Sequence, residues 1–171
     1  MTSHIRRSLF LAFPFLVLLP FTVTLLKAQT PPGIAKKIDP CSLLTKVEIQ
    51  EALGNPVQDG KLSTKANPAV GLPCEYVVGD YGVFSILVKP LGPGETPAKI
   101  LAELNKMKMK TAEASELGDK SFFLFPGYGM VQLNTFKGPY YVIMTLMVPG
   151  LSEDAQKSPA EKLMKKVLPK L

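Results

Sequence analysis

The segment that most constrains the fold of this chain is residues 39–54, DPCSLLTKVEIQEALG. Thr45 and Glu48 stand three residues apart at the start of an apolar-periodic run. This is the spacing of a capping box, in which each side chain binds a backbone N–H of the other residue in the first turn of a helix. Gly54 provides a residue at which the helix can end. A helix of about two turns is marginal alone, so we expect this one to pack against another element.

Cys41 precedes this helix, and Cys74, the only other cysteine, opens a strand-like run. Two cysteines in an exported domain most often pair, and the bridge would close a loop of about 34 residues. The alternatives are a redox-active pair and a metal site. The spacing is not the C-x-x-C of a redox pair. A metal site needs further ligands, and the only histidine, His4, lies near the N-terminus. We therefore favour a structural disulfide and expect no metal.

Residues 1–28 have the pattern of a secretory signal. Two arginines precede an apolar run over residues 8–26, and Ala28 offers the small residue of a cleavage site. The domain is then exported, periplasmic or extracellular. The alternative is an uncleaved anchor with the domain outside the cytoplasm, because about 20 apolar residues can span a bilayer. Residues 29–38 are expected to form a flexible arm, and any membrane contact is expected only through an uncleaved N-terminal segment.

The charge after residue 28 is small. This part carries 17 lysines against 14 acidic residues, a net charge of +3, because Arg6, Arg7 and Lys27 fall in the signal. It contains no arginine and no tryptophan. Nucleic-acid-binding domains rely on basic forks and stacking aromatics, so we expect no nucleic-acid partner.

Five strands are predicted. The β-rich residues 74–78 and 83–88 flank a Gly-Asp-Tyr-Gly turn, which predicts a hairpin. Three later runs are joined by turn-sized links and predict an antiparallel meander: residues 121–125, 130–136 and 140–148. The Gly- and Pro-rich residues 55–73 predict a long loop with one short strand near Val57, and residues 113–120 predict another loop.

Two further helices are expected. Thr96 and Pro97 have the chemistry of an N-cap and a first helical residue, and the helix they open has an apolar face at helical spacing: Ile100, Leu101, Leu104 and Met107. Ser158 and Pro159 repeat these signals before the last helix, although an earlier start at Ser152 stays open. Residues 39–171 are thus expected to form one α+β domain, a two-layer sandwich with about three helices mainly on one face of an antiparallel sheet of about five strands.

These residues resemble small exported bacterial proteins that belong to families of unknown function. The shared opening is Cys-x-Leu-Leu-Thr-x-x-Glu-(hydrophobic)-x-x-Ala-Leu-Gly, followed by a second cysteine before a strand, a Gly-Asp turn and a Lys-Gly hairpin. The positions here are Cys41, Leu43, Leu44, Thr45, Glu48, Ile49, Ala52, Leu53, Gly54, Cys74, Leu117, Gly118, Asp119, Lys137 and Gly138. Glu116 departs from the pattern, because a glycine is often found there. The resemblance implies no activity and transfers no site residues.

Catalysis is not expected. Without a histidine in the exported part, Ser-His-Asp and Cys-His arrangements are excluded, and no G-x-S-x-G or P-loop string occurs. We therefore expect no catalytic residues and no cofactor, with an unrecognised hydrolase that uses carboxylates or a Ser-Lys pair as the remote alternative. The run Lys-Met-Lys-Met-Lys at residues 106–110 is typical of a solvated lysine face with gap-filling methionines. Its alternatives are contact of the lysines with anionic lipid or cell-wall polymer, and binding of copper(I) by the thioethers of Met107 and Met109 together with Met130, Met144 and Met147.

Four tyrosines lie in or beside predicted turns: Tyr81, Tyr128, Tyr140 and Tyr141. Turns that gather at one end of the sheet would make these side chains the rim of a binding surface. The simpler interpretation is that each closes the edge of the core with its hydroxyl in water.

The sequence therefore predicts an exported, disulfide-stapled, non-enzymatic domain that acts as a binding or interaction module of the bacterial envelope. Its partner is an unknown protein or envelope ligand. The alternative is a periplasmic carrier or sensor of a small ligand, with an apolar pocket between the sheet and the helices.

Overall fold

A computed structural model describes residues 36–65, 71–114 and 116–171, which belong to one compact unit. The expected signal, residues 1–28, lies outside the described residues, as does most of the expected arm. Within the described ranges, no helix has both the length and the apolar character needed to cross a bilayer.

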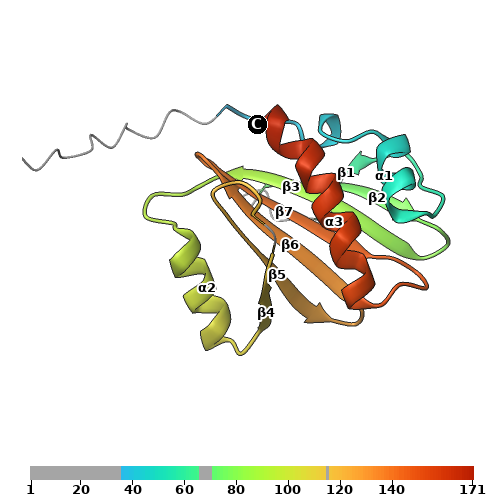
Figure 1. Ribbon diagram of the computed structural model, residues 1–171. Coiled ribbons are helices and arrows are strands. Elements are labelled where there is room, and N and C mark those ends of the chain that lie inside the picture. The colour runs from blue at the N-terminus through green and yellow to red at the C-terminus, as the bar shows by residue number, and fades with distance from the viewer. Residues whose placement is uncertain (1–35, 66–70, 115) are drawn as a thin grey trace, which may run out of the picture. The chain divides into compact units, whose positions relative to one another are not determined.

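The sheet contains seven strands among the described residues, in the order β1-β2-β3-β7-β6-β5-β4, and every neighbouring pair is antiparallel (Figure 1). Their bounds are β1 Lys61–Leu62, β2 Cys74–Val78, β3 Gly82–Pro90, β4 Lys110–Glu113, β5 Lys120–Gly127, β6 Met130–Lys137 and β7 Tyr140–Met147. The α+β class is therefore confirmed, and so are the hairpin β2-β3 and the meander β5-β6-β7.

The expectation of about five strands is wrong, because the two edge strands were not predicted. β1 has only two residues, and Val57, where a strand was expected, makes a single bridge to Val78. β4 has the sequence KTAE, whose ends are charged and exposed. Neither segment has the alternation of apolar and polar residues that marks a strand locally. Their strand conformation comes from pairing with β2 and β5.

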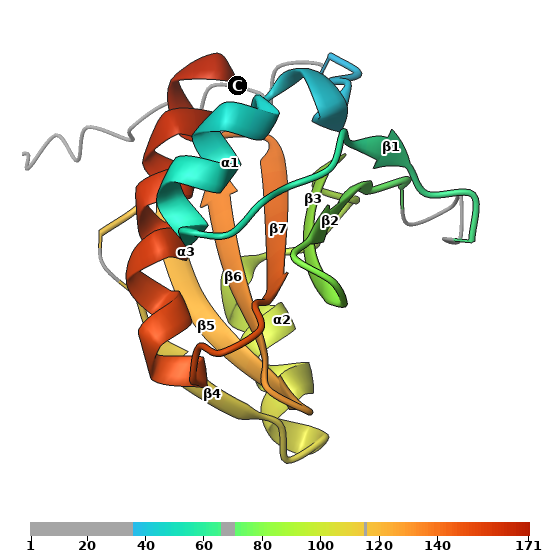
Figure 2. The ribbon, with the colours of Figure 1, turned by 90° about the vertical axis from the view of Figure 1, so that its right-hand side faces the viewer.

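Two helices cover one face of the sheet (Figure 2). α1, Lys46–Leu53, follows a short 3-10 turn η1, Pro40–Ser42, and shows the expected capping box, with Gly54 in the left-handed conformation at its end. α3, Glu153–Val167, continues into a second 3-10 turn η2, Leu168–Lys170. The core between these helices and the sheet is filled by side chains with no exposed surface, among them Ile49, Phe84, Ile86, Met144, Leu163 and Met164.

α3 begins at Glu153, and Ser152 is its N-cap, accepting from the N–H of Ala155, so the start expected at Ser158 is wrong. Pro159 lies inside the helix and cannot donate to the carbonyl four residues earlier. Two features of the first turn offset this loss. Glu153 and Asp154 place negative charge at the helix start, and the buried Gln156 bonds the backbone of the preceding segments.

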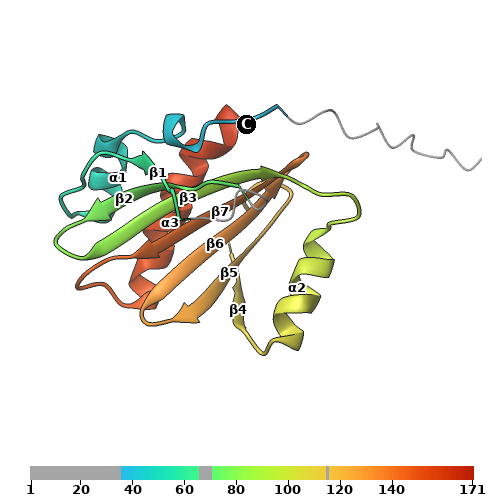
Figure 3. The ribbon, with the colours of Figure 1, turned by 180° about the vertical axis from the view of Figure 1, so that it is seen from behind.

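α2, Pro97–Lys106, lies on the opposite face, so the expectation that the helices pack mainly on one face holds for only two of them (Figure 3). Thr96 caps α2 as expected. Three of its apolar residues pack, half-buried, against a second cluster formed by Phe122, Leu124, Phe136 and Tyr141. Met107, which was expected to be buried, is 62% exposed at the C-terminal end.

Candidate functional site

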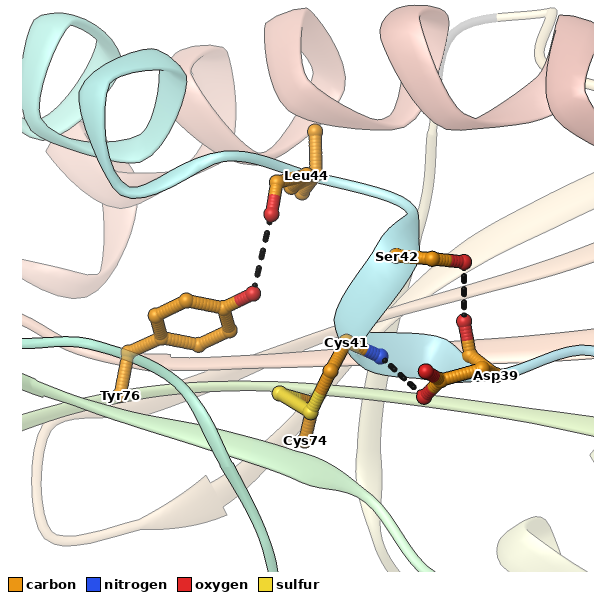
Figure 4. Close-up of a disulfide and its surroundings, with 6 residues drawn as sticks. All are labelled: Asp39, Cys41, Ser42, Leu44, Cys74 and Tyr76. Atoms are coloured by element: carbon orange, nitrogen blue, oxygen red, sulfur yellow. Dashed lines mark hydrogen bonds between the residues drawn. A yellow bond between two sulfur atoms is a disulfide. The ribbon is translucent and has the colours of Figure 1, made fainter.

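Cys41 and Cys74 form a disulfide, as expected from the sequence. The bond joins η1 to the start of β2 (Figure 4). Asp39 caps η1 through the N–H of Cys41, and the Tyr76 hydroxyl donates to the Leu44 carbonyl oxygen at 3.0 Å. Because the Tyr76 bond is buried, the disulfide and this bond together fix the path of the chain from Asp39 into α1.

Beside this corner, where the disulfide joins η1 to β2, the last stretch of β3 has a partner strand on one side only. β2 begins at Cys74, opposite Ile86, so residues 87–90 pair only with β7. The chain before Cys74 turns instead toward β1, where the Ser63 N–H donates to the Pro73 carbonyl oxygen at 2.9 Å. On the other side, the disulfide holds residues 36–40 in place. The space between these segments is a groove of about 850 Å³, which we call the β3-end groove.

The walls of the β3-end groove are largely apolar. Its apolar lining consists of Ile38, Pro40, Leu62, Leu72, Val88 and Pro90. Two of these side chains are unusually open to water for leucines, since Leu62 is 48% exposed and Leu72 is 37% exposed. The core on the α3 face is filled, whereas these leucines add exposed apolar surface to the lining of one groove within the described residues.

Charged residues surround the apolar walls. The polar lining consists of Lys36, Lys37, Asp39, Lys89, Glu95 and Tyr140. Lys36 and Lys37 are exposed, and neither forms an ion pair with any residue that the structure describes. The Tyr140 hydroxyl accepts from the Lys36 N–H at 3.0 Å and donates to the Lys36 carbonyl oxygen at 3.2 Å. Tyr140 therefore anchors the backbone that carries both lysines.

Lys89 and Glu95 form an ion pair within the same lining. The Lys89 Nζ atom lies 2.9 Å and 2.8 Å from the two carboxylate oxygens of Glu95, and the Gly92 N–H donates to Oε2 at 2.7 Å. These bonds hold the pKa of Glu95 below its ordinary value, and the bond from Lys89 makes the larger contribution. Lys89 also lies 5.6 Å from the centre of the Tyr141 ring.

The four tyrosines of the expected rim lie in two places. Tyr81 and Tyr128, in the β2-β3 and β5-β6 turns, are 72% and 94% exposed at the end of the sheet where β7 finishes. Tyr140 and Tyr141 begin β7 at the other end and are buried. Tyr140 reaches the β3-end groove, and Tyr141 donates to the Asn134 Oδ1 atom at 2.5 Å beneath α2. The four side chains therefore do not surround a single site.

The acidic groups with shifted pKa values are engaged in local contacts. The pKa of Glu48 is lowered mainly by its bond to the Thr45 N–H, and that of Asp154 mainly by its bond to Lys157. The described residues contain no group of three His, Cys, Asp or Glu side chains arranged to hold a metal. The methionines considered for copper are also dispersed, since Met144 lies in the main core, Met109 packs on the second cluster and Met107 points into solvent.

Of the residues that line the β3-end groove, sequence reasoning named only Tyr140 as a possible binding residue. Lys36, Lys37, Leu62 and Leu72 lie in segments interpreted as arm and loop, and their meeting depends on where β2 ends against β3. The apolar pocket of the carrier hypothesis was expected between the sheet and the helices, where the α3 face is filled by buried side chains. The groove lies beside the end of β3 instead.

No family model, curated protein or solved structure matches this chain.

Proposed function

We propose that this protein is an exported, disulfide-stapled, non-enzymatic binding domain, and that it binds amphiphilic molecules with an acidic group in the β3-end groove. The observation that carries the proposal is the combination, around one opening of about 850 Å³, of two exposed leucines with two lysines that form no ion pair with a described residue. A volume of this size is in the range of small-molecule sites. The resemblance to small exported bacterial proteins of unknown function is part of this proposal.

The apolar walls supply the binding free energy. Covering apolar surface contributes about 25 cal/mol per Å², and contiguous apolar surface left open to water, as in the lining of this groove, commonly marks a contact surface. Leu62 comes from β1 and Leu72 from the segment before β2. A single alkyl chain that lies along the groove can touch both residues.

The lysines select the charge of the ligand. Lys36 and Lys37 have no competing carboxylate partner among the described residues, so no ion pair of their own has to break before they attract an acidic group bound in the groove. Because both lysines are exposed, this attraction weakens as salt is added. The preference for an acid over a neutral ligand should therefore be salt-dependent.

Export fits the construction of the site. Disulfides persist in oxidising compartments, and the Cys41–Cys74 bond ties together the two segments that border the groove. The signal-like residues 1–28 support the same location, in the periplasm or outside the cell. No enzymatic step is proposed, because the acidic groups with shifted pKa values are explained by helix caps and ion pairs.

Binding of two matched probes tests the proposal. The protein, purified with its disulfide intact, is titrated with fluorescent analogues of dodecanoic acid and dodecanol that carry the same fluorophore. We expect saturable binding of both probes and tighter binding of the acid. Leu72→Asp should weaken the binding of both, because it places a charge on the apolar wall.

Reversing the charge of the two lysines separates their contribution to binding from that of the apolar walls. In Lys36→Glu/Lys37→Glu we expect the affinity for the acid to fall roughly three- to tenfold while that for the alcohol stays the same. The matched control is Lys162→Glu/Lys165→Glu, which makes the same charge change at exposed positions of α3. Absence of saturable binding of either probe, or an equal loss in the control, would refute the proposed function.

A further inference from the structure

The β3-end groove already holds a carboxylate, which belongs to the protein itself. Glu95 receives a two-oxygen contact from the Lys89 ammonium and a backbone bond from the Gly92 N–H, at 2.7 to 2.9 Å. All three residues line the groove. An ammonium group and an N–H directed at one carboxylate form a donor set that recognises acids in general, and Glu95 is the acid within reach.

The chain is shaped to bring Glu95 back onto these donors. The Glu95 N–H donates to the Gly92 carbonyl oxygen at 3.0 Å, which closes a turn over residues 92–95. A β-carbon on Gly92 would stand 3.3 Å from Oε2 of Glu95, so glycine leaves room for the carboxylate to approach. The turn sits between the end of β3 and the N-cap of α2. Lys89 thus precedes the turn, Gly92 opens it, and Glu95 closes it with its carboxylate facing both donors.

The two partners differ in how firmly they are held. The Lys89 side chain is 20% exposed and lies against the Tyr141 ring, whereas the Glu95 side chain is 36% exposed. Lys99, the nearest basic residue of α2 to the turn in sequence, is engaged by the Gly94 carbonyl oxygen. Glu95 can therefore move toward water while Lys89 stays in the groove wall. Lys36 and Lys37 lie in the same lining and add positive charge to it.

We infer that Lys89 Nζ and the Gly92 N–H form the acid-binding subsite of the groove, and that Glu95 is its internal occupant, displaced when the acidic group of a ligand binds. This inference rests on the proposed function and assigns the position of the ligand's head group. Because the ligand's acidic group replaces an existing carboxylate, the subsite fits a carboxylic acid. The free energy gained when the acid binds is reduced by the free energy lost when the Lys89–Glu95 pair separates. An uncharged ligand leaves the Lys89–Glu95 pair intact.

Removal of the internal acid tests the exchange. Glu95→Gln keeps the shape of the side chain but removes its charge, so we expect the dodecanoic acid probe to bind roughly two- to tenfold more tightly, because one competing ion pair is lost. The dodecanol probe should bind as before. The control is Glu103→Gln, which removes the acid of the Glu103–Lys106 pair on α2, away from the groove, and should change neither affinity.

Lys89→Met keeps most of the side-chain stem and removes the ammonium group. We expect it to reduce the preference for the acid over the alcohol. A direct readout is the side-chain carboxyl resonance of Glu95, which should shift when the acid probe is added to the wild-type protein and stay in place with the alcohol.

The outcomes separate this inference from the proposed function. Wild-type protein that prefers the acid, combined with a Glu95→Gln variant of unchanged affinity and an unmoved Glu95 resonance, refutes the exchange and leaves the proposed function in place. Failure of both wild type and Glu95→Gln to bind either probe refutes both.

Discussion

Removal of the Cys41–Cys74 disulfide should be among the most destabilising changes that leave the rest of the chain intact. The cysteines are 33 residues apart in the sequence. In the chain-entropy relation, a bridge across a loop of that length stabilises the folded state by about 4 kcal/mol, because it restricts the unfolded chain. Cys74 is fully buried, so replacing both cysteines by alanine leaves a small cavity that adds about 1 kcal/mol. The expected total is about 5 kcal/mol, a large part of the stability of a typical domain.

Urea unfolding of wild type and of Cys41→Ala/Cys74→Ala measures this loss by linear extrapolation. The dependence on denaturant should also steepen, because the unfolded chain without the bridge exposes more surface. Dithiothreitol supplies the control, since it should lower the stability of the wild type toward that of the variant and leave the variant unchanged. A loss below about 1 kcal/mol, with the same denaturant dependence, would refute the role of the bridge as the staple of this corner.

Two further predictions concern the helices that the corner supports. Gln156 is fully buried, accepts from the Val148 N–H at 3.1 Å and donates to the Gly129 carbonyl oxygen at 2.9 Å. Gln156→Leu leaves both backbone groups without these bonds, so it should lower the free energy of unfolding, measured with urea, by about 2–4 kcal/mol. A change below about 1 kcal/mol would contradict this. The pKa of Glu48 is lowered by the Thr45 N–H, so its contribution to stability is present above its ordinary value of 4.5 and is lost as the pH falls through its lowered pKa. In urea unfolding, the wild type should accordingly be more stable than Glu48→Gln at neutral pH, and this difference in the free energy of unfolding should disappear as the pH falls below about 4.5. A difference that is constant with pH would count against the stabilising role of the cap.

Local signals explain what could be predicted of the fold. The capping box at Thr45 and the Thr96-Pro97 pair each satisfy donors within a few residues, so their helices can be identified without knowledge of the rest of the chain. The meander is equally local, because its strands are joined by short turns. By contrast, β4 becomes a strand only through pairing with β5. Helical periodicity also indicated that α2 has a buried side, but it holds no information on which face of the sheet receives that side.

The site could not be predicted for the same reason. The β3-end groove exists because β2 starts opposite Ile86 while β3 continues to Pro90, and this offset is a property of the register between two strands. Leu72 stands in the sequence only as an apolar residue between glycine and proline. The tyrosines were conspicuous because they adjoin turns, yet adjoining a turn says nothing about the end of the sheet at which that turn lies. The exposed Tyr81 and Tyr128 are accordingly far along the strands from the buried Tyr140.

The central place of β7 in the sheet has a consequence for the order in which the protein can fold. β3 and β6 both pair with β7, which is the last strand in the chain. As the chain is synthesised from its N-terminus, the β2-β3 hairpin forms early with one long edge unsatisfied, and so does the β5-β6 hairpin. Both edges stay unpaired until residues 140–147 have been synthesised, and pairing between strands as far apart in the sequence as β3 and β7 is slow. Before β7 has been synthesised, the open strand edges make this stage the one at which the protein is most exposed to aggregation. A chaperone that prevents aggregation should therefore act on the chain at this stage.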